Sequence, residues 1–298
     1  MKRTTPWWQR LLILAAGLVF AWPIWYMLAT ALTPAEQVLA ERGWRALWPD
    51  APTLAHFRRV LGDSAFLRFM GNSLLITGST VVIGVLVNAW CGFALARLSW
   101  HGRGVVLGLI AALMIIPFEA VAVPLFVLAA RLGWTDSYSV QVLPFVANPF
   151  AVILFTTFFK NLPRELDEAA RIDGASSWQI FWRVALPLAK PAVASVAILT
   201  FILQWGMYLW PLMVTSEASY RPLPVAMGVY SQQRPPVWGE VMAFGTLMVL
   251  PVLLLFLLMQ RAFIRGLSSA AVKGGRCRRV HARRLTRSQP SGGSRGRL

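Results

Sequence analysis

The segment between residues 161 and 187 carries most of the information about this chain. It reads Asn161-Leu-Pro-Arg-Glu-Leu-Asp-Glu-Ala-Ala-Arg-Ile-Asp-Gly174 and continues Ala-Ser-Ser-Trp-Gln-Ile-Phe-Trp-Arg-Val-Ala-Leu-Pro187. Pro163 suits an early helical position, and the acidic residues that follow it favour the positive end of a helix dipole. Gly174 predicts the end of this helix, because a residue without a Cβ atom can adopt the left-handed conformation.

A second, shorter helix is predicted directly after Gly174. Ser176 and Gln179 have the spacing of a capping box. Apolar residues then recur at the spacing of one helix face, namely Trp178, Phe181, Trp182 and Ala185. The pair Leu186-Pro187 is predicted to end the helix. These features leave two interpretations open, a helix lying on the lipid surface or a docking element for a partner protein.

The composition excludes an ordinary soluble protein. Of the 298 residues, 57% are hydrophobic and only 14% are charged, whereas a soluble chain carries about 25% charged residues. Too few charged groups remain to cover a globule in water. We therefore expect a multi-pass integral protein of the cell membrane, that is, the inner or plasma membrane.

Six stretches are long and apolar enough to cross a bilayer, which needs about 20 residues. They are Leu11–Leu32, Phe69–Ala96, Gly104–Ala130, Ser137–Phe159, Pro191–Ser216 and Val241–Gln260. The third stretch contains one formal charge, Glu119, and the other five contain none. Several stretches contain prolines, and in hydrocarbon such breaks survive where helices pack together or line a cavity. No small-residue cleavage site follows the first stretch before Pro34, so we expect an uncleaved helix rather than a signal peptide.

The distribution of Lys and Arg predicts the orientation. With the N-terminus inside, the cytoplasmic segments hold 21 of these residues and the external segments hold 8. Cytoplasmic loops carry an excess of basic residues, so both termini and the segment 161–187 are expected in the cytoplasm. The fold class predicted is an all-α integral membrane protein with six transmembrane helices.

Eleven of the basic residues lie between Arg261 and Leu298, where there is no acidic residue. No zinc-finger spacing or stacking-aromatic motif accompanies this run. A solvated cytoplasmic tail near anionic lipid is therefore favoured over an arm that binds nucleic acid. The two cysteines and three histidines have no neighbours at metal-ligand spacing, so we predict neither a disulfide framework nor a metal site.

No catalytic site is predicted. The longest segments outside the spans, about 33–68 and 160–190, are too short for an enzyme domain. A phosphate-binding loop needs Gly-Lys-Ser/Thr, and none of the four lysines follows a glycine. We expect no enzyme activity and no cofactor on this chain, and an energy source on another chain or in an ion gradient.

Three groups of residues resemble a known family signature. Three short runs are similar to the EAA loop of binding-protein-dependent ABC importer permeases: Glu168-Ala169-Ala170, Asp173-Gly174-Ala175 and, after nine intervening residues from Gly174, Val184-Ala185-Leu186-Pro187. The resemblance extends from about Phe69 to Gly274, and its C-terminal part is typical of the carbohydrate-uptake (MalG-like) branch.

The sequence departs from the family pattern at two places. Trp205-Gly206-Met207 stands where the family usually has Trp-Asn followed by an acidic or polar residue. The chain also continues about two dozen residues past Gly274. The first departure prevents a solute from being assigned by analogy with one particular relative.

The resemblance implies a type I ABC importer permease fold (MetI-like). It also implies a second permease subunit, ABC ATPase subunits that bind and hydrolyse ATP, and an extracytoplasmic solute-binding protein. The expected solutes are sugars or a related polyol or glycerol-3-phosphate. The domains would be 1–68 (first helix and external loop), 69–265 (permease core, with the EAA-like loop at 161–191) and 266–298 (a basic, disordered tail).

In such permeases the EAA loop docks in a cleft of the ATPase. Carried over by motif position, the docking residues are Glu168, Ala169, Ala170, Asp173, Gly174, Trp178, Phe181, Leu186 and Pro187. Glu168 would offer a carboxylate to a basic or amide partner, and Gly174 would form the hinge. The aromatic face could pack on the ATPase or on the chain's own core helices, and both alternatives remain open.

Four residues are candidates for the solute pathway: Glu119, Gln204, Trp205 and Tyr208. An ionisable residue inside a span is a functional candidate by default, although structural pairing of Glu119 is the alternative. Aromatic faces with amide donors suit sugars, yet Trp and Tyr are also common at membrane interfaces without any ligand. The competing functions are an amino-acid or peptide permease, an ion-coupled secondary transporter and a membrane-embedded enzyme.

Overall fold

The computed structural model describes residues 6–38, 48–232 and 236–259. Helices dominate the described ranges, and no strand occurs within them. The all-α fold predicted from the sequence is therefore confirmed. The predicted tail at 266–298 lies outside the described residues.

The chain begins with α1 (Trp7–Leu32), the short α2 (Ala55–Gly62) and the long α3 (Ser64–Arg97). The elements that follow in order are α4 (Arg103–Leu113), α5 (Phe118–Arg131), α6 (Tyr138–Val146), α7 (Pro149–Lys160), α8 (Glu165–Ile172), α9 (Ser177–Ile180), a π-helix (Phe181–Ala185), α10 (Leu186–Leu188), α11 (Lys190–Trp205), α12 (Leu209–Val214), a 3₁₀ turn (Ala218–Tyr220) and α13 (Leu223–Ser231). A final helix runs from Trp238 to Met259.

The described residues supply three candidate spans, or up to six, the number predicted from the sequence, if each bent pair of helices is one span. Three are single helices, α1, α3 and Trp238–Met259, and each is long and apolar enough to cross a membrane. The other three are bent pairs: α4 with α5, α6 with α7, and the segment Ser177–Leu188 with α11. The third, fourth and fifth predicted stretches therefore contain breaks.

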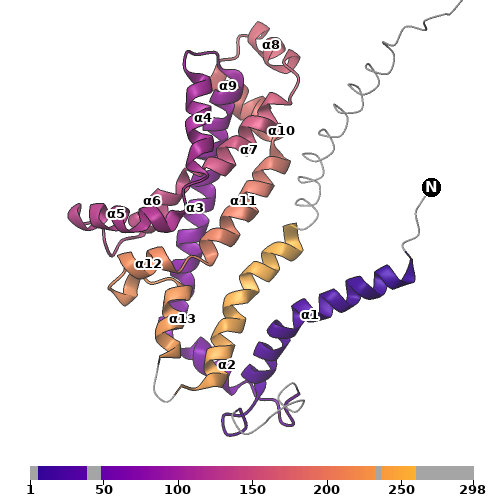
Figure 1. The fold of residues 1–298 in the computed structure, drawn as a ribbon, viewed down its shortest axis with the longest axis vertical. Helices are drawn as coiled ribbons and strands as arrows, with labels where there is room; N and C mark the ends of the chain where they lie inside the picture. The colour runs from indigo at the N-terminus through magenta and orange to yellow at the C-terminus, as the bar shows by residue number, and fades with distance from the viewer. Residues whose placement is uncertain (1–5, 39–47, 233–235, 260–298) are drawn as a thin grey trace, which may run out of the picture.

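The predicted stretch Gly104–Ala130 is not one straight helix. Its two halves meet at an angle of 99°. Pro117 has an extended backbone (φ −67°, ψ 142°) directly before α5, and because proline has no N–H it cannot continue the hydrogen-bond ladder of α4. In Figure 1, α5, α6 and α12 project sideways from the upright helices.

The stretch Pro191–Ser216 is also interrupted. Helix α11 ends at Trp205, and the chain resumes helical geometry only at Leu209. The sequence between them contains Gly206, whose helix propensity is low.

Helix α3 forms the centre of the packed part of the molecule. Its 34 residues correspond to a length of about 50 Å at 1.5 Å per residue. Buried residues of α3 share one core cluster with residues of α7, the π-helix and α11, including Phe93, Phe155, Phe181 and Val196. Helix α1, by contrast, is buried only at its last turn (Ala29–Ala31) and extends away from the other helices in Figure 1.

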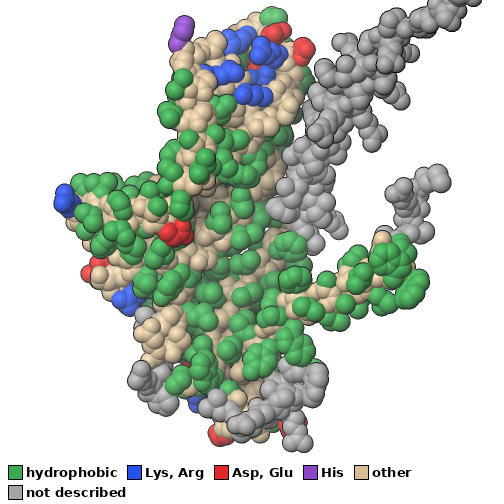
Figure 2. Space-filling model, in the orientation of Figure 1, with side chains coloured by type: hydrophobic (Ala, Val, Ile, Leu, Met, Phe, Trp, Pro, Cys, Tyr) green, Lys and Arg blue, Asp and Glu red, His purple; other side chains and the backbone are tan. Residues whose placement is uncertain are grey.

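The surface reflects this organisation. Figure 2 shows apolar side chains over the middle of the molecule, whereas Lys and Arg side chains gather at the end that carries α8. Basic residues at one end are what a cytoplasmic membrane surface requires.

Candidate functional site

The EAA-like segment forms an exposed helix at one end of the molecule. Helix α8 carries Glu165, Asp167 and Glu168 in its first turn, where the helix dipole favours negative charge. The side chains of Glu168, Ala169 and Asp173 are exposed, and Ala170 is half-buried. Three of the nine predicted docking residues, Glu168, Ala169 and Asp173, are therefore accessible on this helix and at its C-terminal cap.

The glycine hinge has the predicted conformation. Gly174 has φ +81°, a left-handed value that strains residues with a Cβ atom. The N–H of Gly174 donates to the carbonyl of Arg171 at 3.0 Å, and the N–H of Ala175 donates to that of Ala170 at 2.9 Å. These bonds close the C-terminus of α8 and turn the chain towards α9.

The capping box at the start of α9 is also confirmed. The N–H of Gln179 donates to Ser176 Oγ at 3.3 Å, and the N–H of Ser176 donates to Gln179 Oε1 at 2.8 Å. Two backbone N–H groups at the helix start, which have no partner within the helix, are thereby hydrogen-bonded. The chain direction after Gly174 is therefore set by local chemistry.

The second helix ends at Leu188, one residue beyond the predicted Leu186-Pro187 pair. The helix continues through a π-turn (Phe181–Ala185) and α10 to Leu188, and it then bends by 78° into α11. The N–H of Leu186 donates to the carbonyl of Phe181, five residues back. This wider turn admits Pro187, which has no N–H to donate.

The sequence left open whether the aromatic face of the second helix packs on the ATPase or on the chain's own core, and the structure separates its residues into two groups. Phe181 is 1% exposed and belongs to the chain's own core. Its ring lies 4.8 Å from that of Trp90 and 5.4 Å from that of Phe93, both on α3. Trp178 is 55% exposed, so it alone of the two predicted aromatic docking residues is accessible to a partner.

Two features of this site were not predicted from the sequence. Ile172 is 86% exposed at the C-terminus of α8, a large apolar side chain presented to solvent beside the predicted docking residues. Arg97, the last residue of α3, forms an ion pair with Asp167 of α8 at 3.3 Å. A large apolar residue directly before Asp173-Gly174 was a usable signal for Ile172, whereas the Arg97 contact joins distant parts of the chain.

A cavity of about 610 Å³ lies between α3, α11 and the segments around the helix breaks. Met114 and Ile116 come from the break between α4 and α5, Ala147 and Asn148 from that between α6 and α7, and Met207 from that between α11 and α12. Interrupted helices are tolerated in membranes where they line a cavity. The breaks before α5, before α7 and after α11 therefore share one cavity.

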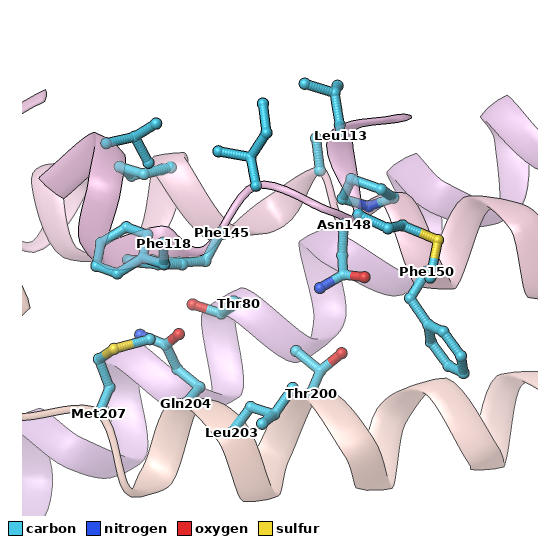
Figure 3. Close-up of a pocket in the computed structure, with 16 residues that line it drawn as sticks. Thr80, Leu113, Phe118, Phe145, Asn148, Phe150, Thr200, Leu203, Gln204 and Met207 are labelled. Carbon is cyan, nitrogen blue, oxygen red and sulfur yellow. The ribbon is translucent and has the colours of Figure 1, made fainter. Parts of the chain in front are cut away.

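The polar groups of the cavity are neutral. Thr200 and Gln204 extend from α11 towards Thr80 of α3 and Asn148 of the α6–α7 break, as Figure 3 shows. Aromatic rings of Phe118, Phe145 and Phe150 form other parts of the wall. None of the described residues that line the cavity carries a formal charge.

The break that carries Asn148 is held by a buried residue of α3. Asn88 is 1% exposed, and its amide donates to the carbonyl of Val146 at 2.8 Å while its Oδ1 accepts from the N–H of Asn148 at 2.9 Å. These bonds satisfy backbone groups that the interruption of the helix would otherwise leave without partners. The position of Asn148 at the cavity is thereby fixed by α3.

The predicted pathway residues do not all meet at this cavity. Gln204 lines it, and its Nε2 donates to the carbonyl of Gln141 at 3.3 Å. Trp205 is buried in another core cluster and donates to the carbonyl of Met248 at 3.0 Å. Tyr208 is 45% exposed and lies beside Gly228 of α13. Neither of these two residues lines the cavity.

Glu119 lies in the first turn of α5, directly after the lining residue Phe118. It is exposed, it does not line the cavity, and it has no ion-pair partner among the described residues. Its carboxylate is compatible with the positive end of the α5 dipole.

The described residues contain no group of three or more His, Cys, Asp or Glu side chains that could hold a metal ion.

The chain matches the family described as "Binding-protein-dependent transport system inner membrane component" over residues 62–269. It is 30% identical over 265 residues to the arabinooligosaccharides transport system permease protein AraQ of Bacillus subtilis, covering 89% of this chain and 94% of that protein. It is 32% identical over 266 residues to the diacetylchitobiose uptake system permease protein DasC of Streptomyces coelicolor, covering 88% and 94%.

Two further comparisons extend the range of related transporters. The sn-glycerol-3-phosphate transport system permease protein UgpE of Yersinia enterocolitica is 34% identical over 223 residues, covering 74% of this chain and 79% of that protein. Among solved structures, a bacterial ABC transporter involved in the import of the acidic polysaccharide alginate aligns with a TM-score of 0.77 and 26% identity, covering 86% of this chain and 95% of the matched one.

Proposed function

This chain belongs to the family of binding-protein-dependent transport system inner membrane components, and on that premise we propose that it moves a neutral sugar across the inner membrane as one permease subunit of an ATP-driven importer. It is a multi-pass membrane transport protein of the sugar ABC importer type, with the MetI-like permease fold. Its family consists of transporter components and not of enzymes.

The exposed helix α8 is the part of the chain that would couple transport to ATP hydrolysis. Its EAA-like residues Glu168, Ala169 and Asp173 face outward, and Gly174 supplies the hinge behind them. We propose that this surface docks on a separate ATPase subunit, which binds and hydrolyses ATP. Closure of the ATPase would displace α8 and change the access of the cavity from one side of the membrane to the other, with ATP binding supplying the free energy.

The same family implies further partners for this chain. The expected ones are a second, similar permease subunit, which would complete the wall of the pathway, and an extracytoplasmic solute-binding protein. The family description, which names binding-protein-dependent transport, supports the latter.

The cavity supports an uncharged carbohydrate as the solute. Thr80, Asn148, Thr200 and Gln204 offer neutral hydrogen-bonding groups, and the phenylalanines of the wall offer flat apolar faces. Sugars present hydroxyl groups around apolar C–H faces, which such a lining fits. A phosphate or an amino-acid zwitterion would leave its charges without partners on this lining, which makes glycerol-3-phosphate and amino acids the weaker alternatives.

Two measurements test this function. Purification of the tagged chain from membranes of its native host should recover an ABC ATPase and a second permease, identified by mass spectrometry. Deletion of the gene should abolish uptake of at least one radiolabelled neutral oligosaccharide and leave uptake of sn-glycerol-3-phosphate unchanged. Recovery of the chain without an ATPase would refute the coupling, and loss of only glycerol-3-phosphate or amino-acid uptake would refute the solute class.

A further inference from the structure

Arg97 is a buried cation at the cytoplasmic end of α3. Its side chain is 6% exposed, and that of its partner Asp167 is 18% exposed. A charge in such a position is costly unless it is paired and hydrogen-bonded. Arg97 Nη1 lies 3.3 Å from Asp167 Oδ2, and Arg97 Nη2 donates to the carbonyl of Leu162 at 2.8 Å. One guanidinium therefore holds both α8 and the segment that leads into it.

The second half of the loop is held by the same helix through apolar contacts. Trp90 of α3 lies 4.7 Å from Trp178 and 4.8 Å from Phe181, measured between ring centroids. Edge-to-face aromatic pairs at such distances are favourable. Both halves of the EAA-like segment thus contact the last two turns of α3.

Helix α3 connects these contacts to the cavity without interruption. It is continuous from Ser64 to Arg97, and Thr80 on the same helix lines the cavity. The 17 positions from Thr80 to Arg97 correspond to about 26 Å along a helix. Asn88, between them, binds the backbone of the break that carries Asn148.

We infer that Arg97 is a positioning residue for transport: it locks α8 to α3, so that a displacement of α8 moves α3 and the cavity wall as one body. The inference rests on the proposed docking of α8 to an ATPase. Without the guanidinium, α8 would lose its ion pair with α3 and keep its chain connections and the apolar packing of Ala170 on the core cluster. Gly174, on one side of α8, is a hinge. The helix would then move without carrying α3 with it.

Distance measurements between spin labels test this rigid connection and do not depend on knowing the solute. Labels are placed at Glu165→Cys on α8, away from the proposed docking residues, and at Val82→Cys on α3, both exposed positions. All labelled proteins also carry Cys91→Ala and Cys277→Ser, so that only the introduced cysteines react with the label. The complex with its ATPase and partner permease is examined in lipid nanodiscs, without nucleotide and with ATP and vanadate.

With Arg97 present, the distance distribution should be narrow and the same in both states. Arg97→Gln and Asp167→Asn should broaden it and shift it when ATP and vanadate are added, and Arg97→Lys should give an intermediate result. Arg59→Gln is the matched control, because Arg59 forms an ion pair of 3.0 Å with Glu240 remote from α8. This variant should leave the distribution unchanged.

The functional consequence is a loss of coupling efficiency. The ratio of ATP hydrolysis without the loaded binding protein to hydrolysis with it should rise in Arg97→Gln. A smaller amount of folded protein would lower both rates and leave this ratio unchanged. A narrow, state-independent distribution in both Arg97→Gln and Asp167→Asn would overturn the inference. Failure of the wild-type complex to retain an ATPase would instead refute the proposed function. If Arg97→Gln does not fold, Asp167→Asn tests the same ion pair.

Discussion

Gly92 of α3 lies so close to Phe155 of α7 that a Cβ atom built on the glycine would stand 2.6 Å from the Phe155 Cβ. It would also stand 2.9 Å from the backbone nitrogen of Thr156. Backbone atoms cannot yield as a flexible side chain can. The separation of α3 and α7, on which the core near α8 is built, is therefore set by the absence of a side chain at position 92.

Gly92→Ala should destabilise the protein by about 1–3 kcal/mol, the usual cost of overpacking a well-filled core. The matched control is Gly78→Ala on the same helix, where an added Cβ meets nothing within 4 Å. That control should be neutral or stabilising by about 0.5–1 kcal/mol, because alanine favours a helix interior over glycine. Thermal unfolding of the two purified variants measures the difference, and equal midpoints would contradict the close approach.

Phe181→Ala and Trp178→Ala should separate the core role from the docking role. Phe181 is fully buried, so its truncation should cost about 3–5 kcal/mol of stability. Trp178 is 55% exposed, and the loss of its ring contacts should cost only about 0.5–1.5 kcal/mol. Thermal unfolding in detergent checks both values. A larger loss for Trp178→Ala than for Phe181→Ala would mean that the buried face has been assigned to the wrong residue.

Gln204→Leu and Trp205→Phe should affect different properties, although the residues are adjacent. Gln204 faces the cavity, so Gln204→Leu should lower solute uptake per assembled complex. Trp205 donates to the carbonyl of Met248 within the core, so Trp205→Phe should cost about 0.5–1.5 kcal/mol of stability and leave uptake per complex unchanged. Uptake normalised to the amount of protein in the membrane decides between them. The reverse pattern would move the pathway to the Trp205 side of α11.

The orientation can be tested by labelling single cysteines in intact cells. With Cys91 and Cys277 replaced, Ser176→Cys should resist a membrane-impermeant thiol reagent, because α9 is expected in the cytoplasm. Asp50→Cys, at an exposed position between α1 and α2, should react. This expectation rests on the 21 Lys and Arg residues in the expected cytoplasmic segments against 8 in the external ones. If Ser176→Cys were labelled and Asp50→Cys were not, the topology would be the reverse, and a cytoplasmic ATPase could not reach α8.

The parts of the structure that the sequence predicted correctly depend on local chemistry. A capping box, a glycine at a helix end and a run of apolar residues act over a few positions, so Ser176, Gly174 and the six spans could be identified from residue types alone. Two prolines, Pro117 and Pro149, stand at helix breaks. Other prolines of the spans lie inside helices (Pro124, Pro144, Pro211), and the break at Gly206 was not predicted. The angle of a break was not predictable, because the 99° turn before Phe118 depends on how α5 packs against its neighbours.

The parts that were missed depend on contacts between distant residues. Phe181 and Trp178 share a face by spacing, and only the approach of Trp90 and Phe93 decides which of them is buried. Trp205 and Gln204 are both plausible sugar contacts by type, but they lie on different sides of α11. The ion pair of Arg97 and Asp167 joins residues 70 positions apart, and no local sequence pattern predicts it.

The central claim is that α8 and its hinge transmit the action of an ATPase, and binding-protein-stimulated ATP hydrolysis tests it most directly. Glu168→Ala should reduce the free energy of ATPase binding by about 2–5 kcal/mol, as expected when one member of a buried charge pair is removed. Glu165→Ala, on the same helix and also exposed, is its control. Gly174→Val should act more severely, because a β-branched residue at φ +81° is strained by about 1–3 kcal/mol.

Gly133→Val controls for this strain, since Gly133 also has a positive φ (+66°) with open space around it but lies outside the loop. Each variant is co-expressed with the ATPase and the second permease, and hydrolysis is measured with and without the solute-loaded binding protein. The predicted result is that Glu168→Ala and Gly174→Val insert normally but lose ATPase retention or stimulation, while both controls keep them. Undiminished retention and stimulation in Glu168→Ala and Gly174→Val would contradict the claim.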